Sequence, residues 1–433
     1  MYKFFFAILF SLLSGSLYAQ NLIDIYQLAE QNDASLKMAQ ANYLTAEASL
    51  PLVTSTQKPQ VNLSVQQSLR ENDNSSIGSN TNRDLGYTLS LTQTIYNAKT
   101  SAQIESVDAS VRQAAANLKV AEQDLVIRVA TRYFAILSAQ DSVKFARAEQ
   151  NAIARQLEQA QKRFEVGLIA ITDVHEAQAL YDRSLAQSLL AENQLDNTFQ
   201  ALQVITAETS SSSLAQLGDQ LSLIIPQPAD IQAWVDTSLQ YNQNLVAALA
   251  ASRAAKFELD SQSRGNYPTV DFNASYNDSR IDDDRLGDSN QDDISLMLQL
   301  NIPLFTGGRI DATRQQAASK YLFAQSTALL QNRLTSQQTR IAYLGVVSGI
   351  GQVKAFKQAL NSSTTALKAT EAGFEVGTRT SVDVLVSLRE TFRAQRDYSS
   401  ARYDYLINTL KLKQAAGLLS PKALTAINRR LSL

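Results

Sequence analysis

The residue types that carry out most protein chemistry are scarce in this 433-residue sequence. It contains no cysteine, which excludes disulfides, thiolate catalysis and lipidated cysteine anchors. Its single histidine, His175, cannot build a histidine-based metal site alone, and we expect it to be structural or solvated. No nucleophile elbow, zinc motif or glycine-rich phosphate loop lies at a convincing junction. The sequence therefore predicts no enzyme, no cofactor and no metal site.

Two segments of the chain are strongly polar, and one of them is rich in aspartate. They are ENDNSSIGSNTNRD (71–84) and the aspartate-rich segment that starts at Arg280 (280–292). Carboxylates can bind calcium, but their spacing here is not that of an EF-hand loop. We expect both segments to be solvated surface loops.

One phrase occurs twice: RFEVGLIAITDV at residues 163–174 and GFEVGTRTSVDV at residues 373–384. Gly167 and Gly377 can adopt the left-handed conformation that ends a helix. Thr172 or Thr380 offers a hydroxyl near the start of the next helix. The residues alone predict two helical hairpin turns, and they do not decide between a simple turn and a functional tip.

The composition and the first residues indicate an exported protein. Charged residues make up 18% of the chain and the net charge is −2, so no basic face for nucleic acid is expected. Residues 1–19 have Lys3, an apolar run and a small residue at Ala19, which is typical of a signal peptide. An uncleaved anchor is the alternative, but the run from Phe4 to Leu13 is short for ~30 Å of hydrocarbon.

The chain contains an internal repeat. Pro59 and Pro268 align at an offset of 209 residues, and the two FEVG segments align at an offset of 210. We predict a first repeat over 20–220, a linker over 221–229, a second repeat over 230–416 and a tail helix over 417–433. Each repeat is expected to contain a helix, a strand pair, a long helix and another helix. In the first repeat we predict the strand pair at 60–97, the long helix at 98–165 and the last helix at 170–207. In the second repeat we predict them at 269–305, 307–375 and 380–416.

The predicted strands alternate strictly between apolar and polar residues. In residues 294–304, for example, Ile294, Leu296 and Leu298 alternate with polar neighbours. A period of two with one apolar face indicates strands. Their length of about ten residues matches a tilted membrane-spanning strand.

The remaining sequence is rich in helix-forming residues and contains no proline between Pro59 and Pro226. Apolar residues recur every seven positions, and a four-residue step then resets the pattern. About 65 residues at 1.5 Å each would form a rod of roughly 100 Å. An ordinary long-helix bundle has the same periodicity. The positions are Ile104, Val111, Leu118 and Leu125, then Val129, Ile136 and Val143.

Four strands cannot close a membrane barrel, because the smallest known membrane barrels use about eight. Two chains would supply eight strands and three would supply twelve, so the strands predict an oligomer that shares one barrel. A soluble extracellular sheet would also explain the alternation. It would not easily explain helices of roughly 100 Å attached to both strand pairs.

The quoted phrases RFEVGLIAITDV and GFEVGTRTSVDVL, together with ARYDYLINTLKLKQAAGLL, resemble the outer membrane efflux protein family. This resemblance implies a mixed fold of helices and membrane strands, in which a homotrimer shares a twelve-stranded β-barrel and a long coiled-coil tunnel crosses the periplasm. It implies a passive outer membrane duct for multidrug efflux or type I secretion. A periplasmic adaptor and an inner-membrane pump or ABC transporter would open it. The alternative is a secreted structural or adhesive coiled-coil protein.

The resemblance also assigns a gate to the repeated phrase. Asp383 matches an aspartate of the narrowest aperture, where three copies would form a carboxylate ring. Repulsion between like charges is expected to raise the apparent pKa of Asp383. The family's second acidic position is Val386 here, which puts a double ring in doubt.

Further gate residues follow from the same match. Arg379 corresponds to an arginine that links the coils, with Thr172 and Asp173 as its expected partners. Phe374 replaces a family tyrosine and lacks its hydroxyl. Lys162 stands opposite Glu371, so we expect an ion pair there. The residues expected to dock the adaptor are Val166, Gly167, Leu168, Val376, Gly377 and Thr378.

Overall fold

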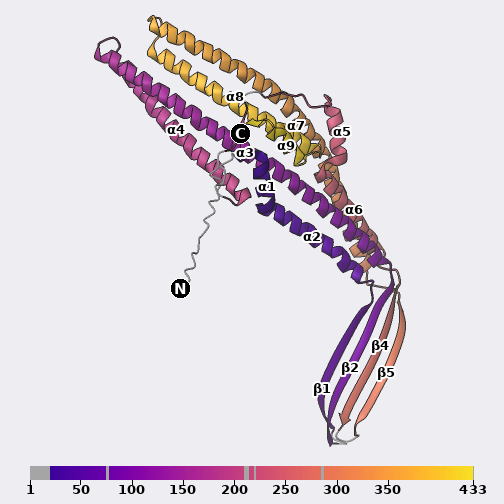
Figure 1. Cartoon of the computed structure of the whole chain (residues 1–433). Coiled ribbons are helices and arrows are strands. Elements are labelled where there is room, and N and C mark those ends of the chain that lie inside the picture. The colour runs from indigo at the N-terminus through magenta and orange to yellow at the C-terminus, as the bar shows by residue number, and fades with distance from the viewer. Residues whose placement is uncertain (1–19, 75–77, 209–213, 219–220, 284–286, 433) are drawn as a thin grey trace, which may run out of the picture. The chain divides into compact units, whose positions relative to one another are not determined.

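The computed structural model describes residues 20–74, 78–208, 214–218, 221–283 and 287–432, so the predicted signal peptide (1–19) lies outside the described residues. None of the helices in these ranges combines the length and apolar composition needed to cross a membrane. The elements in chain order (Figure 1) are α1 (Leu22–Asn32), α2 (Ala34–Ser55), β1 (Gln60–Asn74), β2 (Gly78–Asn97), α3 (Ala98–Glu165), α4 (Ile171–Thr206), β3 (Gln216–Leu217), α5 (Ile231–Tyr241), α6 (Gln243–Ser263), β4 (Thr269–Asp283), β5 (Ser289–Asn301), α7 (Arg309–Glu375), α8 (Ser381–Ala415), α9 (Lys422–Asn428) and β6 (Leu431–Ser432).

The chain forms two compact units, and each unit combines segments from both halves of the sequence. One unit consists of the described residues within Met1–Lys37, Ala121–Asn242 and Ser336–Leu433. The other consists of Met38–Val120 and Gln243–Thr335. The two sequence halves are therefore intertwined rather than folded one after the other.

The second unit contains a four-stranded antiparallel sheet in the order β1-β2-β4-β5 (Figure 1). Two hairpins, β1–β2 and β4–β5, are joined by the pairing of β2 with β4. The strands at the edges, β1 and β5, each have one neighbour within the described residues. Each edge therefore presents backbone N–H and C=O groups that no strand of this chain satisfies.

The strands are longer than the alternation predicted. They span 15, 20, 15 and 13 residues, so much of the predicted polar loops 71–84 and 280–292 is paired strand. The β1–β2 ladder continues to the Asn74–Gly78 pair. The prediction of two long loops was wrong because a ladder depends on backbone hydrogen bonds, which polar residues can also make.

The register gives the sheet one apolar and one polar face. Val61, Leu91, Ala274 and Leu296 lie opposite one another in one row across all four strands. The adjacent row on the other face consists of Asn62, Ser90, Ser275 and Ser295. Apolar side chains on the first face are uncovered in a single chain, with Leu296 71% exposed. Such a face requires another apolar surface or lipid against it.

The second strand pair ends earlier than predicted. We expected strand to residue 305, whereas β5 ends at Asn301 and α7 begins at Arg309. Pro303 has no N–H to donate to a ladder, which favours an end to the strand. Gly307 and Gly308 then take φ values of 60° and 81°, a left-handed conformation suited to the turn into α7.

The seven-residue pattern of α3 is only half confirmed. Leu125, Val129 and Ile136 are fully buried, as the pattern predicts. In the earlier part of the helix, Ile104, Val111 and Leu118 are half-buried. There the buried positions are the small residues Ala102, Ala109 and Ala116, which also recur every seven positions. Small side chains let α6 approach closely, and the Ser106 hydroxyl donates to the Ala254 carbonyl over 2.9 Å.

The first unit has a dense core around α3 and α8. Phe134 stacks on Tyr403 with ring centroids 5.6 Å apart, and both residues are buried. Asp141 accepts hydrogen bonds from the Tyr403 hydroxyl over 2.8 Å and from Ser399. Because the carboxylate ties together two turns of α8, it fixes α8 against α3.

Asp33 connects α1, α2 and α3. Its N–H donates to Ala29 at the end of α1, and its carboxylate accepts from the Leu36 N–H over 2.7 Å at the start of α2. Both terminal nitrogens of the Arg128 guanidinium donate to the same carboxylate over 2.7 and 2.8 Å. Burial raises the pKa of Asp33, but the bonds from Arg128 and Leu36 outweigh burial and lower its pKa overall.

We expect Arg128→Ala to lower the free energy of unfolding at pH 7 by about 2 kcal/mol, because it leaves a buried carboxylate without its cation. This is below the ~3–5 kcal/mol of a fully buried pair, since the Arg128 side chain is 35% exposed. A lowered pKa means that the stabilisation is present above the unfolded pKa of ~3.9 and is lost as the pH falls through the folded value. The difference between wild type and variant should therefore shrink below about pH 4.

Denaturant unfolding followed by circular dichroism at pH 7 and pH 3.5 would measure this difference. The matched control is Arg112→Ala, which removes an exposed ion pair with Asp108. Exposed pairs contribute ~0–1 kcal/mol. Equal losses in the two variants would contradict a special role for the Arg128–Asp33 pair.

Candidate gate at the helical hairpin tips

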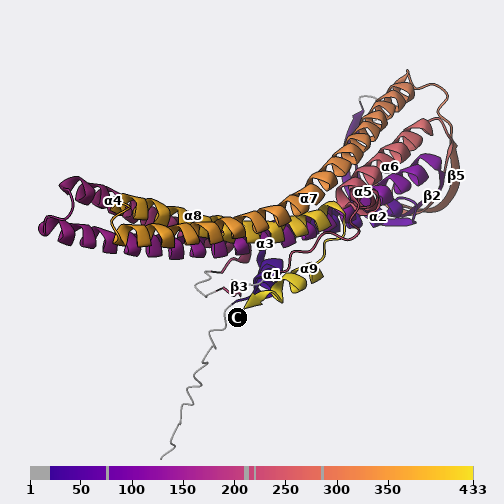
Figure 2. The ribbon, with the colours of Figure 1, turned by 90° about the horizontal axis from the view of Figure 1, so that it is seen from above.

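The two copies of the repeated phrase form the turns of two helical hairpins. α3 and α4 make one hairpin, and α7 and α8 make the other; the two hairpins lie side by side in both views (Figures 1 and 2). α4 of the first hairpin contacts α8 of the second. Segments far apart in the sequence thus place both copies of the phrase at corresponding ends of the two hairpins.

Both turns use the same glycine geometry. Gly167 has φ 74° and donates to the Phe164 carbonyl over 2.9 Å. Gly377 has φ 78° and donates to the Phe374 carbonyl over 3.1 Å. The expectation of left-handed glycines is confirmed at both positions. An L-residue would be strained there, which explains the glycine in both copies.

The residues around the glycines leave apolar side chains in solvent. Val166, Leu168 and Val376 are 69%, 72% and 75% exposed. Thr378 is also exposed, and its hydroxyl donates to the Gly373 carbonyl over 3.0 Å. The residues that we expected to dock a partner therefore lie at the ends of the hairpins, where they are accessible in a single chain.

The helices that follow the two turns begin differently. Thr380 caps α8: its hydroxyl accepts from the Asp383 N–H over 3.2 Å, while the Asp383 carboxylate accepts from the Thr380 N–H over 2.9 Å. This reciprocal pair is a capping box. α4 has Ala170 as its N-cap and no side-chain cap, so Thr172 does not cap it. The capping expectation is confirmed for Thr380 and wrong for Thr172, because the first helix begins at Ile171.

Asp383, the expected aperture residue, is thus also a capping residue. Hydrogen bonds from the Thr380 backbone and hydroxyl, with a smaller effect of Arg379, lower the pKa of Asp383. Within one chain this effect is opposite to the rise that we expected from neighbouring carboxylates. A ring of three carboxylates would have to overcome these bonds before its pKa rose.

Arg379 packs on its own turn. A Cβ atom at Gly373 would lie 2.8 Å from Cγ of Arg379, so a glycine at this position allows the arginine stem to pass. Among the described residues, no hydrogen bond or ion pair joins Arg379 to Thr172 or Asp173. The expected link between neighbouring coils is not formed within one chain and stays a prediction for the assembled protein.

The expected ion pair between Lys162 and Glu371 is not formed. Lys162 instead pairs with Glu158 one turn earlier on α3. This pair raises the pKa of Lys162 and lowers the pKa of Glu158. The prediction was wrong because an i,i+4 partner on the same helix is always within reach, whereas a partner on another helix depends on how the hairpins pack.

Phe374 has a partner that the sequence did not suggest. The Arg163 guanidinium lies 4.4 Å from the centre of the Phe374 ring, in the geometry of a cation–π contact. Arg163 belongs to the last turn of α3 and Phe374 to the last turn of α7. The ring therefore still joins the two hairpins although it lacks a hydroxyl.

Sequence reasoning also missed a groove of about 380 Å³ between α3, α4 and α8. Arg183, Arg389, Arg393 and Arg396 line it. Arg396 bonds over 3.0 Å to Glu149, which is only 8% exposed, so one arginine is used to hold α8 to α3. The i, i+4, i+7 spacing of the three arginines on α8 places them on one helix face and was a usable signal.

The unequal caps predict unequal protection of the two helix starts. We expect Thr380→Ala to speed amide hydrogen exchange at residues 381–384 about fivefold, because a lost N-cap typically costs ~1 kcal/mol. Thr172→Ala is the matched control and should leave exchange at residues 171–174 unchanged. Since the pKa of Asp383 is lowered, wild-type protection should persist as the pH falls and weaken only below about pH 4. Mass spectrometry of both variants checks this, and similar effects of both would contradict it.

Comparison with known proteins identifies the family. The family model described as outer membrane efflux protein matches residues 25–208 and again residues 234–418, which confirms two tandem repeats. The outer membrane protein TolC of Vibrio cholerae serotype O1 is 34% identical over 97% of this chain and 96% of its own length.

Other relatives extend the comparison. The alkaline protease secretion protein AprF of Pseudomonas aeruginosa is 27% identical over 94% of this chain and 86% of its own length. The structure of the Campylobacter jejuni CmeC outer membrane channel shares the fold, with a TM-score of 0.80 and 14% identity over 95% of this chain and 90% of that one. The sequence-based assignment is confirmed: the chain belongs to the outer membrane efflux protein family and is an outer membrane duct for efflux or secretion.

Proposed function

We propose that three copies of this chain form one passive export duct. Each copy contributes β1, β2, β4 and β5 to a closed barrel of twelve strands, and the long helices form a tunnel that extends into the periplasm. The observation that supports this most strongly is the sheet register, which gives four strands one continuous apolar face and one continuous polar face. A lipid-facing exterior and a water-filled interior require this arrangement.

The free edges of the sheet support closure between chains. β1 and β5 each have one strand partner within the described part of the chain. Lipid offers no hydrogen bonds to an open edge, so β5 of one copy would pair with β1 of the next. Strand pairing of this kind satisfies both edges of every copy when the ring closes.

The gate in this proposal is the pair of hairpin turns. Asp383 would form the carboxylate ring at the aperture and favour cations. Arg379 would link one coil to Thr172 and Asp173 of a neighbouring coil. Each link at an exposed tip contributes less than about 1 kcal/mol, which suits a closure that a partner protein can release.

The duct does no catalysis in this proposal, so its partners supply the energy. An adaptor would contact the exposed residues on both sides of Gly167 and Gly377. An inner-membrane efflux pump or ABC transporter would deliver the substrate. The names of the relatives support both efflux and protein secretion, since AprF is a protease secretion protein and the Brucella suis relative BepC is an outer membrane efflux protein.

Adjacent substitutions on β5 test the two faces of the sheet. Leu296→Arg places a charge on the apolar face, where charges cost roughly 2–4 kcal/mol near the bilayer midplane, and we expect it to reduce insertion into the outer membrane. Ser295→Arg places the same charge on the polar face and should insert normally while weakening cation selectivity. Membrane fractionation and planar-bilayer recording measure both. Equal insertion of the two variants would argue against a lipid-facing row at Leu296.

Single-channel conductance tests the gate. We expect a small, cation-selective conductance from the mature protein, a larger conductance from Arg379→Ser and weaker cation selectivity from Asp383→Asn. The matched control is Arg393→Ser, because Arg393 lies within α8, away from the turn that holds Arg379, and pairs with Glu390. A protein that stays soluble without detergent and shows no conductance would contradict the proposal that the chain forms a duct. An equal increase in conductance from Arg393→Ser would contradict only the assignment of the gate to Arg379.

A further inference from the structure

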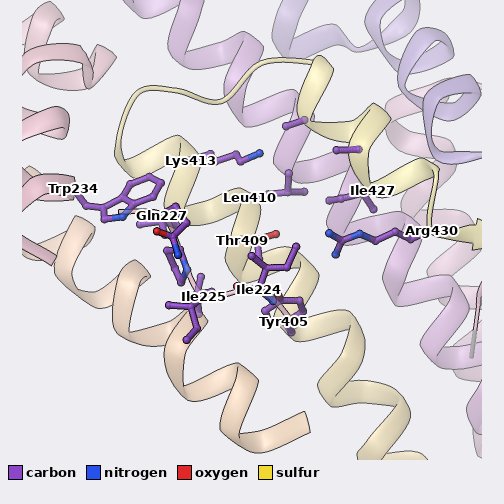
Figure 3. A pocket seen from close by; sticks show the side chains of 15 residues that line it. Ile224, Ile225, Gln227, Trp234, Tyr405, Thr409, Leu410, Lys413, Ile427 and Arg430 are labelled. Carbon is purple, nitrogen blue, oxygen red and sulfur yellow. Dashed lines mark hydrogen bonds between the residues drawn. The ribbon is translucent and has the colours of Figure 1, made fainter. Parts of the chain in front are cut away.

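A pocket of about 270 Å³ lies where the segment 221–230, called the crossing segment below, passes α5, α8 and α9 of the first unit (Figure 3). Its inner wall is apolar and buried, with Tyr405 and Leu410 each 1% exposed and Ile427 5% exposed. Ile224 and Ile225 of the crossing segment lie over this wall and are 54% and 53% exposed. The pocket therefore has a buried apolar inner wall and an apolar edge, formed by the two isoleucines, that is exposed to solvent.

The aromatic residues of the pocket have their polar atoms satisfied. The Trp234 indole N–H donates to the Pro228 carbonyl over 2.9 Å. The Tyr405 hydroxyl donates to the Ile224 carbonyl over 3.2 Å and accepts from the Ile224 N–H over 2.9 Å. These bonds fix the crossing segment to the helices. They also leave only the apolar ring surfaces for anything that enters the pocket.

The charged residues that line the pocket are both cations. Lys413 lies in the last turn of α8, and Arg430 follows α9 (Figure 3). No acidic residue is among the described residues of the lining. Neither side chain has an ion pair or hydrogen bond within the described ranges. The C-terminal end of α8 carries a partial negative charge, which by itself favours a cation at Lys413.

We propose that this pocket binds a small amphiphilic anion. The apolar body, of the size of a short acyl chain or one ring, would contact Trp234, Leu410 and Ile427. Its carboxylate, or a similar anionic head, would lie between Lys413 and Arg430. The volume of about 270 Å³ is slightly below the ~300–1,000 Å³ typical of ligand pockets, which argues against a two-chain lipid. The bound ligand would cover Ile224 and Ile225 and hold the crossing segment in place.

The chain supplies its own reporter for this pocket, because Trp234 is its only tryptophan. The experiment titrates the full mature protein in nanodiscs with octanoate and records the tryptophan emission. Octyltrimethylammonium, which has an alkyl tail of similar length and the opposite charge, is the matched control ligand. We expect a saturable change with octanoate and at least about tenfold weaker binding of the cation. Equal responses to both ligands would mean nonspecific partitioning and would overturn the proposal.

Charge-removing variants compare the two cations of the pocket with basic residues next to them in the sequence. Lys413→Gln and Arg430→Gln should each weaken octanoate binding about tenfold, the change expected for one lost charge-assisted hydrogen bond. Lys411→Gln and Arg429→Gln remove exposed charges nearby that do not line the pocket, and they should bind as wild type does. Unchanged binding in both pocket variants, or equal loss in the controls, would overturn the proposal.

A third substitution within the pocket tests the cavity itself. Ala426 lines the pocket and is exposed, so Ala426→Phe should fill its mouth and abolish the response without disturbing the core. Circular dichroism of each variant checks folding. Octanoate binding that survives Ala426→Phe would place the ligand elsewhere. The test does not depend on the duct, since the readout is Trp234 emission and not conductance.

Discussion

The backbone of the edge strands sets the strongest constraint on this molecule. Each interior strand of the sheet has hydrogen-bond partners on both sides, whereas β1 and β5 have them on one side within the described chain. In the proposed duct the apolar row from Val61 to Leu296 faces lipid, where unpaired N–H and C=O groups cost several kcal/mol each. A single chain cannot remove that cost. In the proposed duct, assembly with further copies would remove it, so the sheet would complete its hydrogen bonding only in the assembled barrel.

In the first unit, the long helices have to begin, end and stay in register with one another. Hydrogen-bonded carboxylates do part of this. Asp33 ends one helix, starts the next and binds Arg128, while Asp141 holds two turns of α8 through Tyr403 and Ser399. Each carboxylate accepts more than one hydrogen bond, so it fixes one arrangement of the helices instead of merely adding apolar area.

The sequence predicted those features that depend on local pattern. Period-two alternation identified the strands, proline-free periodic stretches identified α3 and α7, and the repeated glycines identified both turns. It failed where pairing decides the outcome. Backbone pairing extends β1 through polar residues to Asn74. Lys162 forms its ion pair with Glu158 on its own helix and not with the expected Glu371. The Arg163–Phe374 contact and the pocket around Trp234 join segments far apart in the sequence, which no local pattern could place together.

The unequal starts of α4 and α8 affect the symmetry of the tip. Both turns keep the glycine that sets their geometry, but only the second has the Thr380–Asp383 capping box. In the proposed trimer, three chains would present six hairpins of two kinds in alternation around the axis. The ring then has threefold and not sixfold rotational symmetry, although the six backbone turns are nearly alike. A protein that surrounds this ring would meet two chemically different sites in turn, so identical subunits would bind it with two different affinities.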